Sequence, residues 1–144
     1  MCEQEKTVNL SRSEAREQAF MLLFSRSFVK EPIEDTFADA EQLFEGGVCD
    51  YARVVVPGIE AVQDEIDGDI SPFLKKGWSL QRISRTSLSI LRLAMYEIKY
   101  LESIPDSVSV NEAVELAKKY TIDESGFVNG VLGSYIRSRS EAQS

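Results

Sequence analysis

One long amphipathic segment constrains the fold of this chain more than any other feature of its sequence. From Ser84 to about Leu101, apolar residues recur with the spacing of an α-helix. The apolar face consists of Leu88, Leu91, Met95 and Ile98, widened by Ile90, Leu93 and Ala94. A helix of this length extends about 27 Å, which approaches the diameter of a small domain. We therefore expect this segment to be the central helix around which the others pack.

Helical spacing of apolar residues also dominates the rest of the chain. Further helices are expected over residues 13–28, 35–44, 51–66, 70–76 and 124–137. The helix over residues 51–66 is expected to continue through Pro57, because apolar residues keep the same spacing on both sides of it. Another helix is expected to open at Ser109, since Ser109 and Glu112 have the spacing of a capping box. No strand pattern is convincing, so the sequence predicts an all-α fold of about seven helices.

Length and composition favour one globular domain spanning residues 1–144. The chain is 43% hydrophobic and 28% charged, close to the average for globular proteins. No apolar run approaches the ~20 residues that a membrane span requires. The first residues carry charges of both signs and lack the apolar stretch of a signal peptide. We expect a cytoplasmic protein with no membrane partner.

The inventory of reactive side chains argues against catalysis. The sequence contains no histidine, which removes the commonest general base and the commonest ligand of transition metals. Its two cysteines, Cys2 and Cys49, form neither a CxxC pair nor a disulfide framework. No glycine-rich phosphate-binding motif occurs. The sequence therefore predicts a binding protein without catalytic residues, cofactor or metal.

Charge is distributed unevenly along the chain. The net charge of −8 disfavours nucleic acid at face value. Residues 31–70, however, contain one basic residue against twelve acidic ones, whereas residues 71–100 contain six basic residues and one acidic residue. In the expected central helix a polar stripe follows helical spacing through Arg85, Ser89, Arg92, Tyr96 and Lys99. This asymmetry is typical of an adaptor with two partners, and a solvated charged face is the commoner explanation of a single stripe.

Several motifs in a fixed order resemble the NusB family of transcription antitermination factors. The C-terminal half contains Trp78 ahead of an arginine-containing helix, followed by ILRLAMYE, IPDSVSVNEAVELAK and FVNGVL at residues 90–97, 104–118 and 127–132. The N-terminal segment SRSEAREQAFMLLF, residues 11–24, resembles the opening of the same family. These segments cover both ends and more than half of the chain.

The resemblance implies a compact bundle of two helical subdomains that catalyses nothing. Members of the family bind the boxA element of ribosomal RNA leaders jointly with NusE, a small-subunit ribosomal protein that also acts in elongation. The complex helps RNA polymerase to read through terminators in ribosomal RNA operons. The expected partners are therefore boxA RNA, NusE and the antitermination complex of RNA polymerase.

Carried onto this chain, the arginine-rich N-terminal element of the family falls on Arg12 and Arg16. Guanidinium groups suit contacts with phosphates and unstacked bases. Relatives usually have further cations where this chain has Ser13 and Glu14. We therefore expect a low intrinsic affinity for RNA, raised when NusE is present.

The other expected site residues lie along the rest of the chain. The resemblance places Phe127 and Asn129 at the RNA, where an aromatic ring can stack on a base. The alternatives are a core position for Phe127 and a structural hydrogen bond for Asn129. The partner surface for NusE is expected at Phe24, Arg82 and Arg85.

Two other functions compete with the antitermination adaptor. One is the NusB-like domain of a ribosomal RNA methyltransferase, which needs a following S-adenosylmethionine-binding domain that these 144 residues do not contain. The other is a helical module that forms homodimers. Electrostatics add one expectation for the cations Arg82, Arg85, Arg92 and Lys99. If they are exposed, RNA or an acidic surface of a partner should meet them, and the acidic segment 31–70 should face away.

Overall fold

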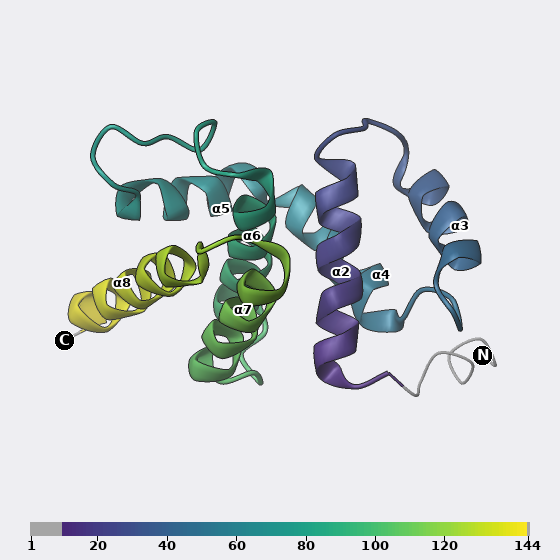
Figure 1. The fold of residues 1–144 in the computed structure, drawn as a ribbon. Coiled ribbons are helices and arrows are strands. Elements are labelled where there is room, and N and C mark those ends of the chain that lie inside the picture. The colour runs from purple at the N-terminus through teal and green to yellow at the C-terminus, as the bar shows by residue number, and fades with distance from the viewer. Residues whose placement is uncertain (1–9, 144) are drawn as a thin grey trace. The chain divides into compact units, whose positions relative to one another are not determined.

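The computed structural model describes residues 10–143, where all regular secondary structure is helical (Figure 1). The predicted all-α fold of about seven helices is confirmed for this part of the chain. Its seven α-helices and one 3-10 helix are α2 (Arg12–Arg26), α3 (Ile33–Leu43), α4 (Asp50–Ala61), α5 (Gln63–Ile70), η1 (Ser71–Phe73), α6 (Arg85–Tyr100), α7 (Asp106–Tyr120) and α8 (Ser125–Gln143). The chain divides into two compact units, with the boundary between Ala61 and Val62.

The first unit is built on the packing of α2 against α4. Helix α2 begins with a capping box, in which the Ser11 hydroxyl accepts from the backbone of Glu14 and the Glu14 carboxylate accepts from the backbone of Ser11. Ala19 of α2 and Ala52, Val56 and Ile59 of α4 are fully buried.

A buried amide fixes the loop that joins α3 to α4. The side chain of Gln18 donates to the carbonyl of Gly47 at 3.1 Å and accepts from the backbone N–H of Cys49 at 2.8 Å. Gly47 has a φ of +82°, and a Cβ at this position would overlap the carboxylate of Glu41. That carboxylate itself accepts from the N–H of Val48 at 2.9 Å. The loop therefore has a defined shape because two side chains satisfy its backbone groups.

We expect Gln18→Ala to destabilise the protein by about 1–2 kcal/mol, because it leaves two buried backbone groups without partners. Chemical denaturation followed by circular dichroism measures this loss. The matched control is Gln42→Ala, which truncates an exposed glutamine in α3 and should have little effect. Equal stability of the two variants would show that the Gln18 bonds contribute nothing.

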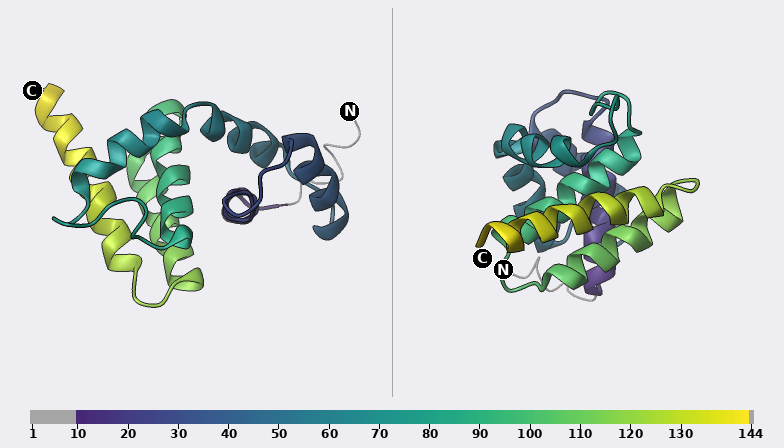
Figure 2. Two further views of the ribbon diagram at one scale, coloured as in Figure 1. Left: turned by 90° about the horizontal axis from the view of Figure 1, so that it is seen from above. Right: turned by 90° about the vertical axis from the view of Figure 1, so that its left-hand side faces the viewer.

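The second unit is organised around α6, as the amphipathic pattern predicts. Helix α6 packs against α5, α7 and α8, and Figure 2 shows α6 and α7 alongside one another. Ile90, Leu91 and Met95 of α6 are fully buried, as are Ala117 of α7 and Leu132 of α8. The expectation of a central helix is confirmed within this unit.

The expected helix over residues 51–66 is two helices in the structure. Pro57 lies inside α4, as expected, and the break comes instead at Val62, whose φ of −123° is not helical. The two parts pair with different elements: Glu60 of α4 binds Arg26 of α2, whereas Asp67 of α5 binds Arg92 of α6. The break therefore divides the two units.

The start of α7 and the segment after α5 also differ from expectation. Helix α7 begins at Asp106, because the carbonyl of Pro105 already accepts from the N–H groups of Val108 and Ser109. Ser109 is not a cap: its buried hydroxyl donates to the carboxylate of Glu97, which is 1% exposed, at 2.7 Å. Ile70 is the last residue of α5, and the rest of the helix expected over residues 70–76 is only the 3-10 turn Ser71–Phe73. Pro72 has no N–H with which to continue the hydrogen bonds of α5. The last helix continues beyond residue 137, to Gln143.

Candidate nucleic-acid interface

The two N-terminal arginines expected at the RNA have different surroundings. Arg12 is the first residue of α2 and is exposed. Arg16 lies one turn later and is only 5% exposed. Phosphate binding requires an accessible guanidinium group, so Arg12 is the better placed of the two.

Phe24, expected at the partner surface, belongs to a line of aromatic rings along the end of α2 and the turn that follows it. Its ring stacks on that of Phe20, with centroids 6.1 Å apart, and meets the ring of Phe28 edge-on at 5.0 Å. Phe24 is half-buried, while Met21, Phe28 and Val29 are exposed nearby in the sequence. This end of α2 therefore presents apolar surface next to Phe24.

The cationic stripe of α6 is largely neutralised by acids of α5. Arg92 donates through two nitrogens to the carboxylate of Asp67, both at 2.8 Å. Lys99 binds Asp69 at 2.5 Å and also Glu65. The expectation that the acidic segment faces away from these cations is wrong for α5, because residues 63–70 pack directly against α6.

The pKa values around Lys99 follow from the same contacts. Partial burial lowers the pKa of Lys99, but the hydrogen bonds to Asp69 and Glu65 outweigh it and raise that pKa above its ordinary value. The hydrogen bond from Lys99 lowers the pKa of Glu65, and the hydroxyl of Tyr100 adds to the effect. Lys99 and Glu65 therefore both stay charged at neutral pH, and Lys99 is occupied by its own neighbours.

A cationic segment runs from the end of η1 to the first residue of α6. The segment from residue 74 to residue 85 contains Lys75, Lys76, Arg82 and Arg85 and no acidic residue. All four side chains are exposed. We call residues 74–85 the basic loop. It includes both arginines expected at the partner surface.

Phe127 lies at the first turn of α8, beside Trp78 of the basic loop. The two rings are tilted by 41° with centroids 6.0 Å apart. The carboxylate of Glu124, just before α8, accepts from the hydroxyls of Ser84 at 2.7 Å and of Ser87. These bonds attach the end of the basic loop and the start of α6 to the start of α8. Sequence reasoning assigned no role to Trp78, although it stands in the motif that carries the family resemblance.

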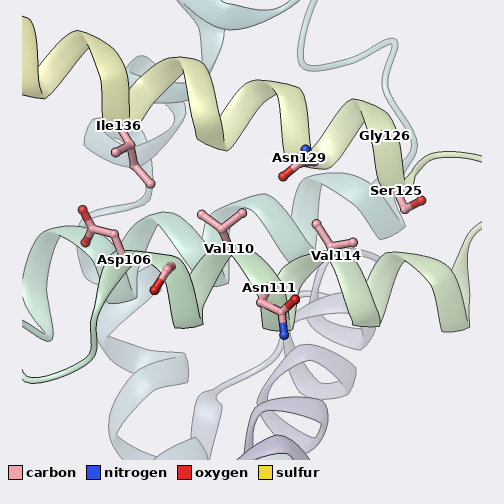
Figure 3. A pocket seen from close by; sticks show the side chains of 9 residues that line it. Asp106, Val110, Asn111, Val114, Ser125, Gly126, Asn129 and Ile136 are labelled. Atoms are coloured by element: carbon pink, nitrogen blue, oxygen red, sulfur yellow. The ribbon is translucent and has the colours of Figure 1, made fainter.

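Asn129 faces a different surface from Phe127. It lines a groove of about 710 Å³ between α7 and α8, where Val110 and Val114 lie opposite it (Figure 3). Two residues along a helix rotate a side chain by about 200°, which explains the separation. The structure thus brings Phe127 together with Trp78 and places Asn129 in a groove with an apolar floor.

The described residues offer neither a metal site nor a membrane-spanning helix. Residues 10–143 contain no group of three or more histidine, cysteine, aspartate or glutamate side chains arranged to hold a metal ion. In the same residues, no helix has the length and hydropathy needed to cross a membrane. Cys49 is buried, and this burial raises the pKa of its thiol.

Comparison with known proteins gives consistent matches. The family model described as the NusB family matches residues 13–137. The transcription antitermination protein NusB of Lacticaseibacillus casei is 39% identical over 133 residues, which cover 92% of this chain and 98% of that protein. The solved structure of T. maritima NusB is 35% identical, covers 89% of this chain and 92% of its own, and superposes with a TM-score of 0.78.

A further solved structure contains a relative with its partners. It is a crystal structure of the antitermination factors NusB and NusE in complex with double-stranded RNA. The matching chain is 28% identical, with a TM-score of 0.74, and the match covers 88% of this chain and 96% of that one. From the family model, the curated relative and the fold together, this chain belongs to the NusB family.

Proposed function

We propose that this protein is a transcription antitermination factor that binds boxA RNA of ribosomal RNA leaders together with NusE and promotes read-through by RNA polymerase. The observation that carries the proposal is the match, over 88% of the chain, to a NusB protein solved with NusE and RNA. The curated relative is matched over 98% of its own length and has an antitermination name, which favours an adaptor over a methyltransferase domain. Such an adaptor acts on nascent RNA in the cytoplasm.

The charges of the chain support joint rather than independent binding of RNA. With a net charge of −8, and with Arg92 and Lys99 paired internally, few cations remain for phosphates. A basic partner supplies the missing attraction, so affinity should rise sharply on assembly. The two units would then serve as one RNA-binding domain.

Residues are assigned to the two partners as follows. We assign Arg12, Phe127 and Asn129 to RNA, and we assign Arg16, which is only 5% exposed, to the RNA site on the family resemblance alone. We assign Phe24, Arg82 and Arg85 to NusE. The assignment of Arg12 is supported by its exposed position at the start of α2, that of Phe127 by its partly exposed ring at the start of α8, and that of Phe24 by the exposed apolar residues near it in the sequence.

The test is a titration of labelled boxA-like RNA with this protein, with NusE, and with the two mixed, at several salt concentrations. We expect weak binding by each protein, tight binding by the mixture, and loss of tight binding on a scrambled RNA. Indifference to NusE and to RNA sequence would contradict the proposal. Gel filtration of the protein with and without NusE identifies a homodimer, the competing function.

Within this test, Arg12→Ala should weaken RNA binding by the complex several-fold and lower its salt slope by about 0.7, the value for one phosphate contact on single-stranded RNA. The matched control is Arg53→Ala, which removes the same charge from an exposed arginine already paired with Glu41. If both variants change the slope equally, Arg12 makes no specific contact and acts only through net charge.

A further inference from the structure

Trp78 is an exposed tryptophan. It is 49% exposed, whereas tryptophan side chains in globular domains are usually largely buried. Its backbone lies in a tight turn, in which the backbone N–H of Trp78 donates to the carbonyl of Lys75 at 2.8 Å. Gly77 takes a φ of +85° in this turn, a conformation that favours glycine. The exposure of Trp78 therefore follows from an ordered turn.

One edge of the indole is supported by Phe127, so that the two rings form a continuous aromatic surface. The centroid separation of 6.0 Å and the 41° tilt leave part of each ring uncovered by the other. Glu124 holds this arrangement together through its bonds to Ser84 and Ser87. Phe127 itself is half-buried, so most of the accessible ring area belongs to Trp78.

One cation lies beside the indole, and the basic loop contains no acidic residue. The ammonium of Lys75 lies 6.0 Å from the centroid of the Trp78 ring, and Lys76 and Arg82 are exposed within the same basic loop. Among the described residues, Lys75, Lys76 and Arg82 form no ion pair with an acid of α5, in contrast to Arg92 of α6. An aromatic face beside one cation, in a loop that carries further cations, is the combination that binds unpaired bases and their phosphates.

We propose that Trp78 is a base-stacking residue of the RNA site, which extends the aromatic surface of Phe127 by one position. An unpaired base stacks on the indole, and Lys75, which covers the ring in the free protein, moves to the adjacent phosphate. The inference rests on the proposed function and adds to it a contact in the loop between η1 and α6. The charge of the basic loop favours RNA over an apolar protein segment as the occupant.

Trp78 is the only tryptophan of the chain, so its fluorescence reports this contact directly. The experiment titrates unlabelled single-stranded boxA-like RNA into the preformed complex of this protein with NusE and follows tryptophan emission. The same titration with the Trp78→Phe complex gives the background from NusE. We expect RNA to quench the emission of the wild-type complex in proportion to its binding.

The variants separate stacking from charge. Trp78→Ala should weaken RNA binding by about tenfold, because one stacked base is lost, and should leave the salt slope unchanged. Trp78→Phe should bind nearly as tightly as the wild type, since it keeps a ring. Lys75→Gln should instead lower the salt slope of RNA binding, because it removes a contact with phosphate. The matched control is Tyr100→Ala, which removes an exposed aromatic residue whose hydroxyl donates to Glu65. This variant should not change the affinity for RNA.

The results distinguish a failure of the Trp78 inference from a failure of the proposed function. Unchanged emission on RNA binding, with wild-type affinity of Trp78→Ala, would overturn the role of Trp78 and leave the antitermination proposal standing. If the wild-type complex fails to bind the RNA at all, the proposed function fails and this inference fails with it. Circular dichroism of Trp78→Ala establishes that a loss of affinity does not arise from unfolding.

Discussion

Leu91→Ala is expected to lower the free energy of unfolding by about 3 kcal/mol, the largest loss that we predict for a single residue. Leu91 is fully buried in α6, which packs against three other helices of its unit. The truncation removes the transfer free energy of the side chain and leaves a cavity among neighbours that relax only in part. Urea denaturation followed by circular dichroism measures the change.

The matched control is Leu43→Ala, because Leu43 at the end of α3 is 82% exposed. That variant should change stability by less than about 0.5 kcal/mol. A loss below about 1 kcal/mol for Leu91→Ala would contradict the description of α6 as the centre of its unit.

Arg92→Ala is expected to lower the free energy of unfolding by about 2–3 kcal/mol and to leave the salt dependence of RNA binding unchanged. The Arg92 and Asp67 side chains are 15% and 19% exposed, so removal of the arginine leaves a half-buried carboxylate without its two hydrogen bonds. RNA binding is insensitive because Asp67 already neutralises the guanidinium. Denaturation curves and RNA titrations at several salt concentrations measure the two effects on the same variant.

Arg53→Ala is the control for the stability change. Arg53 and Glu41 form an exposed pair, 41% and 44% accessible, which should be worth less than about 1 kcal/mol. The double variant Arg92→Ala with Asp67→Ala should recover part of the loss, since no charge is then left unpaired. A fall in the salt slope on Arg92→Ala would mean that Arg92 contacts phosphate, contrary to its pairing in the structure.

The fold class could be predicted because it depends on local periodicity. The apolar stripe of α6 and the helical spacing on both sides of Pro57 are properties of adjacent residues, and both are confirmed by the structure. The break at Val62 could not be predicted in this way. It separates Glu60, which binds Arg26, from Asp67, which binds Arg92, and no local pattern contains these distant partners.

The same limit applies to the capping box expected at Ser109. Its spacing to Glu112 is correct for a cap, but the buried carboxylate of Glu97 provides a competing acceptor for the serine hydroxyl. The spacing of a serine and a glutamate three residues apart does mark a cap at Ser11, where the helix start is exposed and no buried group competes. Tertiary contacts thus decide which of two similar motifs acts as a cap.

The sequence could indicate which types of residue form the candidate site, but not how their side chains are arranged. Sequence alone treats Arg12 and Arg16 alike, whereas the structure exposes the first and buries the second. It also treats Phe127 and Asn129 as neighbours, although a helix directs them to different surfaces. Burial and direction require the packing of whole helices, so they appear only in three dimensions.

The loop held by Gln18 has a consequence for how the sequence can vary. Any side chain at position 47 meets the carboxylate of Glu41, and the positive φ adds strain of its own. Glu41 in turn cannot be shortened without releasing the N–H of Val48 and the guanidinium of Arg53. Position 47 is therefore restricted twice, by its own backbone angle and by Glu41, whereas position 41 is restricted by the two groups that its carboxylate binds.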